Sequence, residues 1–288
     1  MSSTVVTTPL ALRYVKTVGT ISAGGKGVAG RGFNGPVDVA ISGDGRIFVL
    51  NRTQIRVCIC DLEEEFLGDF ASGPGSADGE LTLPVAMAFD GQERLYVTDE
   101  CNHRVTVFDA DGHFLSKWGT RGSEPGQLDG PAGIAIDPDD NVYLVDQNNA
   151  RIQQFTADGE HLAGWGQFGT SPGQFNLPWG LALGPDGAVY VADWRNDRVQ
   201  KFSPEGELLA IFGAVGNGDS RLNRPAGVAV DGEGLVYVAD WGSERLKVFS
   251  SEGTLVANLR GQATLSRWAM EYFESNPDEW EMRQKANM

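Results

Sequence analysis

Short runs in which apolar and polar residues alternate cover most of the chain between about residues 33 and 261. In the stretch from Pro178 to Gly213, the segments GLALG, AVYVAD, RVQKF and ELLAIFG have the composition or the two-residue period of strands. Two turns, Pro185-Asp186-Gly187 and Pro204-Glu205-Gly206, lie between them, where proline fixes φ and glycine accepts a positive φ. No window of ten residues with helical periodicity fits between these turns. The stretch therefore predicts four antiparallel strands.

The same pattern returns with a period of 47 or 48 residues. Its markers are a proline, a polar residue at a strand end, and an arginine five residues after that. The prolines are Pro36, Pro84, Pro131, Pro178 and Pro225. The strand-end residues are Asn51, Asp99, Asp146, Asp193 and Asp240, and the arginines are Arg56, Arg104, Arg151, Arg198 and Arg245. A period of this length that contains four strands is typical of one blade of a β-propeller.

Large rings also recur at fixed positions of the repeat. One series lies three residues before the strand-end residue: Phe48, Tyr96, Tyr143, Tyr190 and Tyr237. Two more lie nine and nineteen residues after it: Phe108, Phe155, Phe202 and Phe249, then Phe70, Trp118, Trp165 and Phe212. We expect these rings to pack between neighbouring blades, where each buried ring contributes roughly 1.5–3 kcal/mol.

The run V-Y-V-A-D-W-x-N-x-R-V-Q-K-F, from Val189 to Phe202, resembles the NHL repeat, and the resemblance covers five copies from about Phe33 to Gly261. It differs from the WD40 pattern, because tryptophan follows the aspartate and the glycine-histidine element is missing. The resemblance implies a β-propeller, most often with six blades, that uses one face for binding. It implies no reaction, since the family includes peptide lyases, RNA-binding modules and many members of unknown role.

Both ends of the chain depart from the repeat. Leu12 to Gly19 resembles the fourth strand of the unit, which in closed propellers often completes a blade from the opposite end of the chain. After Gly261 the pattern becomes helical, with an apolar face that includes Trp268, Tyr272 and Phe273. Asn276-Pro277 ends that run and caps a second helix that carries Trp280.

We therefore predict an all-β fold: an NHL-type propeller over residues 1–261, with five complete four-stranded blades and an N-terminal strand of an incomplete sixth blade. A helical appendix over residues 262–288 is expected to pack on or beside it. Three arrangements fit this pattern: a six-bladed protein that lacks three strands, a five-bladed ring, or closure by a partner or a second copy of the chain. An open ring exposes apolar blade faces and favours self-association.

Composition narrows the function classes. The formal net charge is −16, which disfavours nucleic-acid binding, because phosphate contacts require clustered Lys and Arg, and disfavours anionic membranes for the same reason. The first residues lack the cationic and apolar regions of a secretory signal, and the sequence contains no transmembrane stretch. Cys58 and Cys60 share one face of a predicted strand and are interpreted as small packing residues. A reduced, cytoplasmic setting is expected.

Residues that could carry chemistry lie in the loops on one face of the propeller, between the second and third strands of each blade. From these loops we select six candidate binding residues: Arg52, His103, Asn148, Trp194, Arg195 and Trp241. Neighbouring loop residues are Glu100, Asn102, Gln147, Asn149, Asn196, Ser243 and Glu244. Trp194 and Trp241 carry the prediction, because rigid exposed rings anchor binding partners.

Catalytic and metal sites are not predicted. The strand-end polar residues and their arginines recur in every blade. This recurrence indicates a structural role, because a catalytic site would be expected in one place and not in each repeat. His103, His113 and His161 are the three histidines, and the last two are expected at the opposite end of the propeller from the first. The run from Asp137 to Asn141 resembles the start of a calcium loop but lacks its glycine.

These observations favour a non-catalytic propeller that presents one loop face to a protein or peptide partner, with no cofactor. The alternative is an enzyme of the lyase or lactone-hydrolase type with a divalent ion in the central channel. RNA binding requires a basic face, which the charge balance disfavours.

Overall fold

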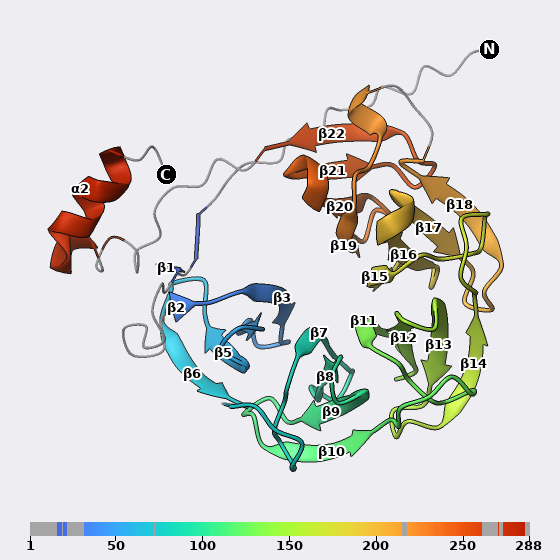
Figure 1. Cartoon of the computed structure of the whole chain (residues 1–288), viewed down its shortest axis with the longest axis horizontal. Helices are drawn as coiled ribbons and strands as arrows, with labels where there is room; N and C mark the ends of the chain where they lie inside the picture. The colour runs from blue at the N-terminus through green and yellow to red at the C-terminus, as the bar shows by residue number, and fades with distance from the viewer. Residues whose placement is uncertain are drawn as a thin grey trace.

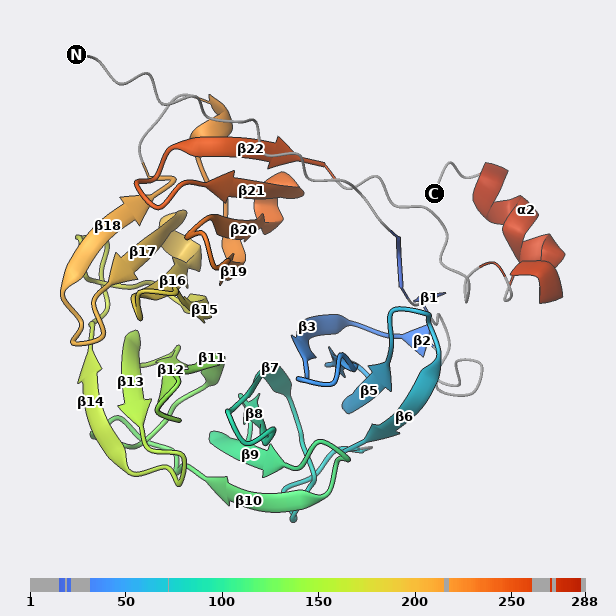
Figure 2. The same cartoon turned by 180° about the vertical axis from the view of Figure 1, so that it is seen from behind.

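The computed structural model describes residues 16–18, 20–21, 32–71, 73–214, 218–260, 270 and 273–285. Five four-stranded antiparallel sheets are arranged around a common axis as the blades of a propeller (Figure 1). The predicted fold class is confirmed. In both views the first strand of each blade faces the centre and the fourth strand forms the rim (Figure 2).

Each blade has the same order of strands, and we number the blades 1 to 5 along the chain. The inner strands are β3 (Pro36–Ile41), β7 (Pro84–Phe89), β11 (Pro131–Ile136), β15 (Pro178–Leu183) and β19 (Pro225–Val230). The second strands are β4 (Ile47–Asn51), β8 (Leu95–Asp99), β12 (Val142–Asp146), β16 (Val189–Asp193) and β20 (Val236–Asp240). The third strands are β5 (Arg56–Cys60), β9 (Arg104–Phe108), β13 (Arg151–Phe155), β17 (Arg198–Phe202) and β21 (Arg245–Phe249). The rim strands are β6 (Phe66–Phe70), β10 (Phe114–Trp118), β14 (His161–Trp165), β18 (Leu208–Phe212) and β22 (Leu255–Leu259).

The repeated polar markers fix the register of each sheet. The inner-strand proline is opposite the strand-end residue, as in Pro178 and Asp193, and that residue is opposite the arginine that opens the third strand, Arg198. The residue before the arginine has a positive φ in every blade, with His103 at 51° and Asp197 at 54°. Since this conformation recurs in all five loops, it is a property of the tight loop and not of one site.

Four apolar clusters join the blades, one at each interface between consecutive blades. Between blades 1 and 2, for example, Phe48 and Leu50 pack against Val97 and Phe108. The other three interfaces use equivalent residues, with Tyr96 and Phe155, Tyr143 and Phe202, and Tyr190 and Phe249 as their rings. The predicted packing of the repeated rings between blades is confirmed for these residues, whereas Tyr237 of blade 5 belongs to none of the four clusters.

The outward faces of blades 1 and 5 have no neighbouring blade among the described strands. Leu246 of blade 5 is 39% exposed, whereas its equivalents Val105, Ile152 and Val199 in the other blades are 0% exposed. On blade 1, Val39 and Ile41 of β3 are 57% and 66% exposed. The five described blades therefore form an arc and do not close on one another, which differs from a closed five-bladed ring.

Short elements lie at the two ends of the arc. A short N-terminal strand, β1 (Thr20–Ile21), pairs in parallel with β2 (Gly32–Phe33) beside blade 1. Of the strand expected over residues 12–19, residues 16–18 have no regular structure and the rest lie outside the described residues. Val18 packs against the outward face of blade 1, where Cys58 and Cys60 are buried as expected.

The second predicted C-terminal helix is present as α2 (Pro277–Lys285), which begins directly after Asn276 as the sequence indicates. The rings of Phe273 and Trp280 lie 4.8 Å apart across the junction. Residues 265–269, 271 and 272 of the first predicted helix lie outside the described residues. The division of the chain at residue 261 stays a prediction. No described helix is long and apolar enough to cross a membrane.

Candidate functional site

The recurring aspartate and arginine hold the connection that enters each blade. Asp193 Oδ2 accepts hydrogen bonds from Arg198 Nε at 2.8 Å, Asn196 Nδ2 at 2.9 Å and Gln200 Nε2 at 3.1 Å. Its Oδ1 accepts from the backbone of Asn176 at 2.8 Å. Arg198 also donates to three backbone carbonyls of the preceding connection. Burial raises the pKa of Asp193 in spite of these hydrogen bonds. This geometry supports the structural interpretation.

Blade 5 departs from this arrangement. Lysine replaces the glutamine of blades 3 and 4 at position 247, and Lys247 Nζ lies 2.8 Å from Asp240 Oδ2. Lys247 is buried and also donates to the carbonyl of Arg221. Ser243 stands where blades 2 to 4 have asparagine. Among the described residues, Arg245 makes no hydrogen bond or ion pair, whereas its four equivalents all do.

Residues from different blades meet on the loop face, at the mouth of the central channel. Arg52 of blade 1 donates to Glu100 of blade 2 at 2.5 Å, and its Cζ lies 5.7 Å from the ring centroid of Trp179 in blade 4. Trp179 in turn lies 6.4 Å from Trp194. Arg195 and Arg224 complete the group, with Cζ atoms 4.9 and 5.5 Å from the Trp194 ring. We call these six residues the channel-mouth cluster.

His103 and Asn148, two other candidates, lie beside this cluster around one carboxylate. Asn148 Nδ2 donates to Asp129 Oδ1 at 3.2 Å, and His103 Nδ1 lies 3.4 Å from the same oxygen. His103 Nδ1 also accepts from the backbone of Gly130 at 3.2 Å. Gly130 has a φ of 67°, and a Cβ there would lie 2.6 Å from Asn148 Nδ2. The two side chains thus brace a tight connection, and Asn148 remains exposed.

Trp241 is separate from the cluster and is 61% exposed. It lines a concavity of about 740 Å³ on blade 5, together with Arg224, Glu244, Arg245 and Leu246. Arg224 belongs to both features, since its guanidinium lies over Trp194. The structure therefore brings Arg52, Trp194 and Arg195 together and places Trp241 next to them, across Arg224.

The central channel is mostly apolar. Its cavity of about 420 Å³ is lined by the inner strands of all five blades, and Asp38 is the one charged side chain among the lining residues. Asp38 Oδ2 accepts from the backbone of Met87 at 2.7 Å, and Oδ1 accepts from Val39 at 2.9 Å. Burial raises the pKa of Asp38 to about 6.

A divalent ion held by side chains does not fit these channel residues. Such ions require several oxygen ligands, and the channel supplies one carboxylate whose two oxygens already accept backbone hydrogen bonds. Within the described part of the chain, no three His, Cys, Asp or Glu side chains are grouped so that they could hold a metal.

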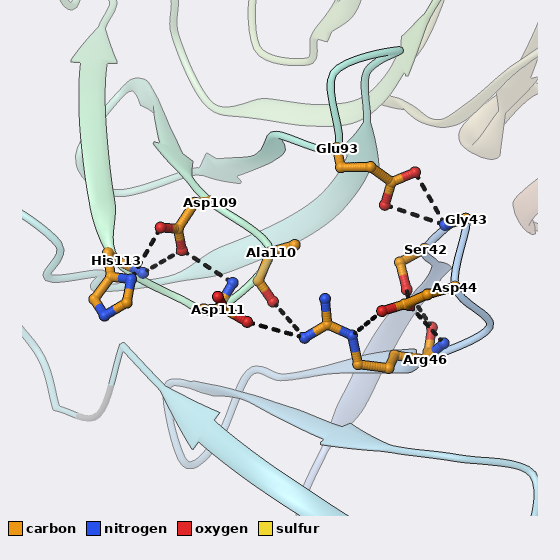
Figure 3. Close-up of polar contacts among 9 residues, drawn as sticks. All are labelled: Ser42, Gly43, Asp44, Arg46, Glu93, Asp109, Ala110, Asp111 and His113. Atoms are coloured by element: carbon orange, nitrogen blue, oxygen red, sulfur yellow. Dashed lines mark hydrogen bonds and ion pairs between the residues drawn. The ribbon is translucent and has the colours of Figure 1, made fainter.

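The opposite face of the propeller carries polar contacts between the turns of blades 1 and 2 (Figure 3). Glu93 accepts two hydrogen bonds from the backbone of Gly43, at 3.0 and 3.1 Å. Arg46 donates to the carbonyl of Ala110 at 2.9 Å and lies 3.3 Å from Asp111. His113 pairs with Asp109 in its own turn, on the face opposite His103, as predicted. These contacts join blade 1 to blade 2 and therefore have a structural role. The candidate site is on the loop face.

The sequence analysis did not identify Trp179 or Arg224 as site residues, and it did not predict that Arg245 lacks the contacts of the other framework arginines. A signal for Trp179 was present, because the other copies have valine or alanine at its position. The signal for Arg245 was Lys247, the charged residue where other copies have cysteine, threonine or glutamine. Both signals lie in differences between copies, whereas the repeat was found from what the copies share.

Two families match parts of the chain. Residues 81–108 and 222–249 match the NHL repeat, and residues 125–214 match the SMP-30/Gluconolactonase/LRE-like region. A comparison with curated proteins finds no match.

Several solved structures share the fold at low sequence identity. Virginiamycin B lyase from Staphylococcus aureus with quinupristin is 13% identical with a TM-score of 0.60, over 80% of this chain and 71% of that one. A gluconolactonase from Xanthomonas campestris is 19% identical with a TM-score of 0.59, over 81% and 78%. A chain of a nidogen/laminin complex is 18% identical with a TM-score of 0.62, over 78% and 80%. At these identities the likeness concerns the fold alone.

Proposed function

Because this chain is an NHL-repeat β-propeller, a fold that positions loops without implying a reaction, we propose that it is a binding platform for a protein or peptide partner. The partner contacts the loop face at the channel-mouth cluster. The similarity to a propeller in a nidogen/laminin complex supports this use of the fold.

The observation that carries the proposal is the arrangement of Trp179 and Trp194. The two half-buried rings lie 6.4 Å apart with guanidinium groups against both of them. Tryptophan and arginine are the side chains most enriched among residues that dominate binding energy. Since Arg52 is already paired with Glu100, its position is fixed before a partner arrives, which lowers the entropic cost of binding.

The charges of the cluster define the partner's chemistry. Arg195 and Arg224 are exposed and have no carboxylate partner among the described residues, on a protein whose net charge is −16. A segment with an acidic side chain next to an apolar or aromatic residue matches this surface, because the acid pairs with arginine and the apolar group packs on tryptophan.

Site-specific photocross-linking tests the proposal. A photoreactive residue at position 195 should capture one discrete partner from the host's own extract, and the combined Trp179→Ala and Trp194→Ala change should abolish capture. The matched control places the same probe at position 111 on the opposite face. Equal capture from both positions, or capture that survives the tryptophan changes, contradicts the proposal.

A second candidate function is a lyase or lactone hydrolase. It is favoured by the match of residues 125–214 to the SMP-30/Gluconolactonase/LRE-like region and by the half-buried Asp38, whose carboxylate lines the channel. Turnover of gluconolactone or quinupristin that is lost in Asp38→Asn supports it. If neither compound is turned over and the purified protein contains no bound metal above background, this candidate function is contradicted.

We place the protein in the cytoplasm as part of the same proposal. The two buried cysteines, which form no disulfide, are compatible with a reducing compartment. Imaging of the tagged protein in its host tests this location, and an extracellular signal contradicts it.

A further inference from the structure

The framework arginine of blade 5 is free to bind a ligand. We propose that Arg245, with Arg224 and Trp241, forms a binding site for a small organic carboxylate on blade 5. This site goes beyond the binding platform, since it takes a small molecule and does not include Trp179 or Trp194.

The release of Arg245 has a specific cause. In blades 3 and 4 the equivalent arginines donate from Nε to the strand-end aspartate, at 2.7 Å for Arg151 and 2.8 Å for Arg198. In blade 5 the buried Lys247 Nζ lies 2.8 Å from Asp240 Oδ2, the oxygen that accepts from the arginine Nε in blades 3 and 4. Blade 5 thus has two cationic side chains that could pair with Asp240, and Lys247 is the one that does. Arg245 keeps its five N–H donors, and no described residue accepts from them.

The concavity that Arg245 lines has the parts of a small-ligand site. Its volume of about 740 Å³ is within the range of ligand pockets. Trp241 supplies an exposed ring at one side, and Ala239 and Leu246 supply apolar surface from the outward face of blade 5. Arg224 adds a second guanidinium on the side of the channel mouth.

The charges of the lining favour a monoanion. Arg224 and Arg245 attract an anion, while Asp240 and Glu244 also line the concavity and repel a second negative charge. A carboxylate matches the planar fork of arginine through two parallel hydrogen bonds, and an attached apolar group can pack on Trp241. Inorganic phosphate, which is largely dianionic at pH 7.5, fits this lining less well.

Saturation-transfer NMR with 3-phenylpropionate tests the site on the full chain, with 3-phenylpropanamide as the uncharged analogue and inorganic phosphate as competitor. We expect the acid to bind, the amide to give no signal, and equimolar phosphate to leave binding intact. Arg245→Gln should weaken binding by about tenfold or more, because it removes a charge-assisted hydrogen-bond pair. Arg121→Gln is the matched control, since Arg121 is exposed, lies in the connection between blades 2 and 3 and does not line the concavity, and it should bind as the wild type does.

Lys247→Gln is the decisive variant because the buried lysine cannot touch the ligand. Glutamine at this position restores the sequence of blades 3 and 4, so Arg245 should turn to Asp240 and binding should fall by a factor similar to that in Arg245→Gln. Thermal unfolding shows whether each variant is folded. The inference is overturned if the wild type does not bind the acid, if the amide binds equally, if phosphate displaces the acid, or if both variants bind as the wild type does.

Discussion

Replacement of Asp38 by asparagine should stabilise the protein above pH 6 and have little stabilising effect near pH 4. The Asp38 carboxylate lines an apolar channel, and burial raises its pKa from 3.8 to about 6. The native protein therefore keeps a proton on Asp38 between about pH 4 and 6, where the unfolded chain has lost it. Since the native state binds more protons in this window, the free energy of unfolding falls as pH rises from 4 to 6.

The magnitude follows from the size of the shift. A difference of about two pKa units at about 1.36 kcal/mol per unit gives up to about 3 kcal/mol, and residual contact of the carboxylate with solvent lowers this value. Asparagine keeps an oxygen that can accept from the backbone of Met87, so the variant removes the charge with little loss of hydrogen bonding.

Urea unfolding of the wild type and Asp38→Asn at pH 4, 5, 6 and 7 measures the effect. The stability difference between the two proteins should grow with pH up to about 6 and then level off. Asp44→Asn is the control, because the hydrogen bond from Ser42 lowers the pKa of Asp44 and moves its pH dependence below about pH 4. A stability difference between wild type and Asp38→Asn that stays constant from pH 4 to 7 would refute the reasoning.

Three further predictions concern the framework and the thiols. Asp193→Ala should cost about 3–5 kcal/mol in urea unfolding, because it leaves the buried Arg198 charge without its partner; a loss under 1 kcal/mol contradicts this. Gly180→Ala should cost about 1–3 kcal/mol, since the new Cβ would lie 2.5 Å from a backbone oxygen of β19, whereas Gly232→Ala, with open space around it, should cost less than 1 kcal/mol. With a thiol reagent at pH 7.5, the exposed Cys101 should react in the native protein, while the two buried thiols, whose pKa burial raises to about 11, should react only after unfolding.

The repeat made the blades predictable from sequence. Each strand has a two-residue period, and the markers such as Asp193 and Arg198 recur at a constant step, so local pattern and global fold agree. The ring positions, for example Tyr190 and Phe202, also followed, because a residue type that is conserved across copies reports a packing environment that all copies share.

The site was less predictable because it depends on contacts between distant copies. Arg52 and Trp179 are 127 positions apart in the sequence and meet only when blades 1 and 4 face each other across the channel mouth. The role of Arg245 depends on the single residue Lys247, and a pattern that treats all five arginines as equivalent cannot show it. The raised pKa of Asp38 likewise depends on its burial in the channel, which the strand pattern does not predict.

The most direct test of the central claim compares partner capture by the wild type, the protein with Trp179→Ala and Trp194→Ala, and Asp111→Ala on the opposite face, each immobilised at equal amounts of folded protein. The account predicts one partner that binds the wild type and Asp111→Ala alike and is lost from the tryptophan variant. A partner retained equally by all three proteins would contradict it.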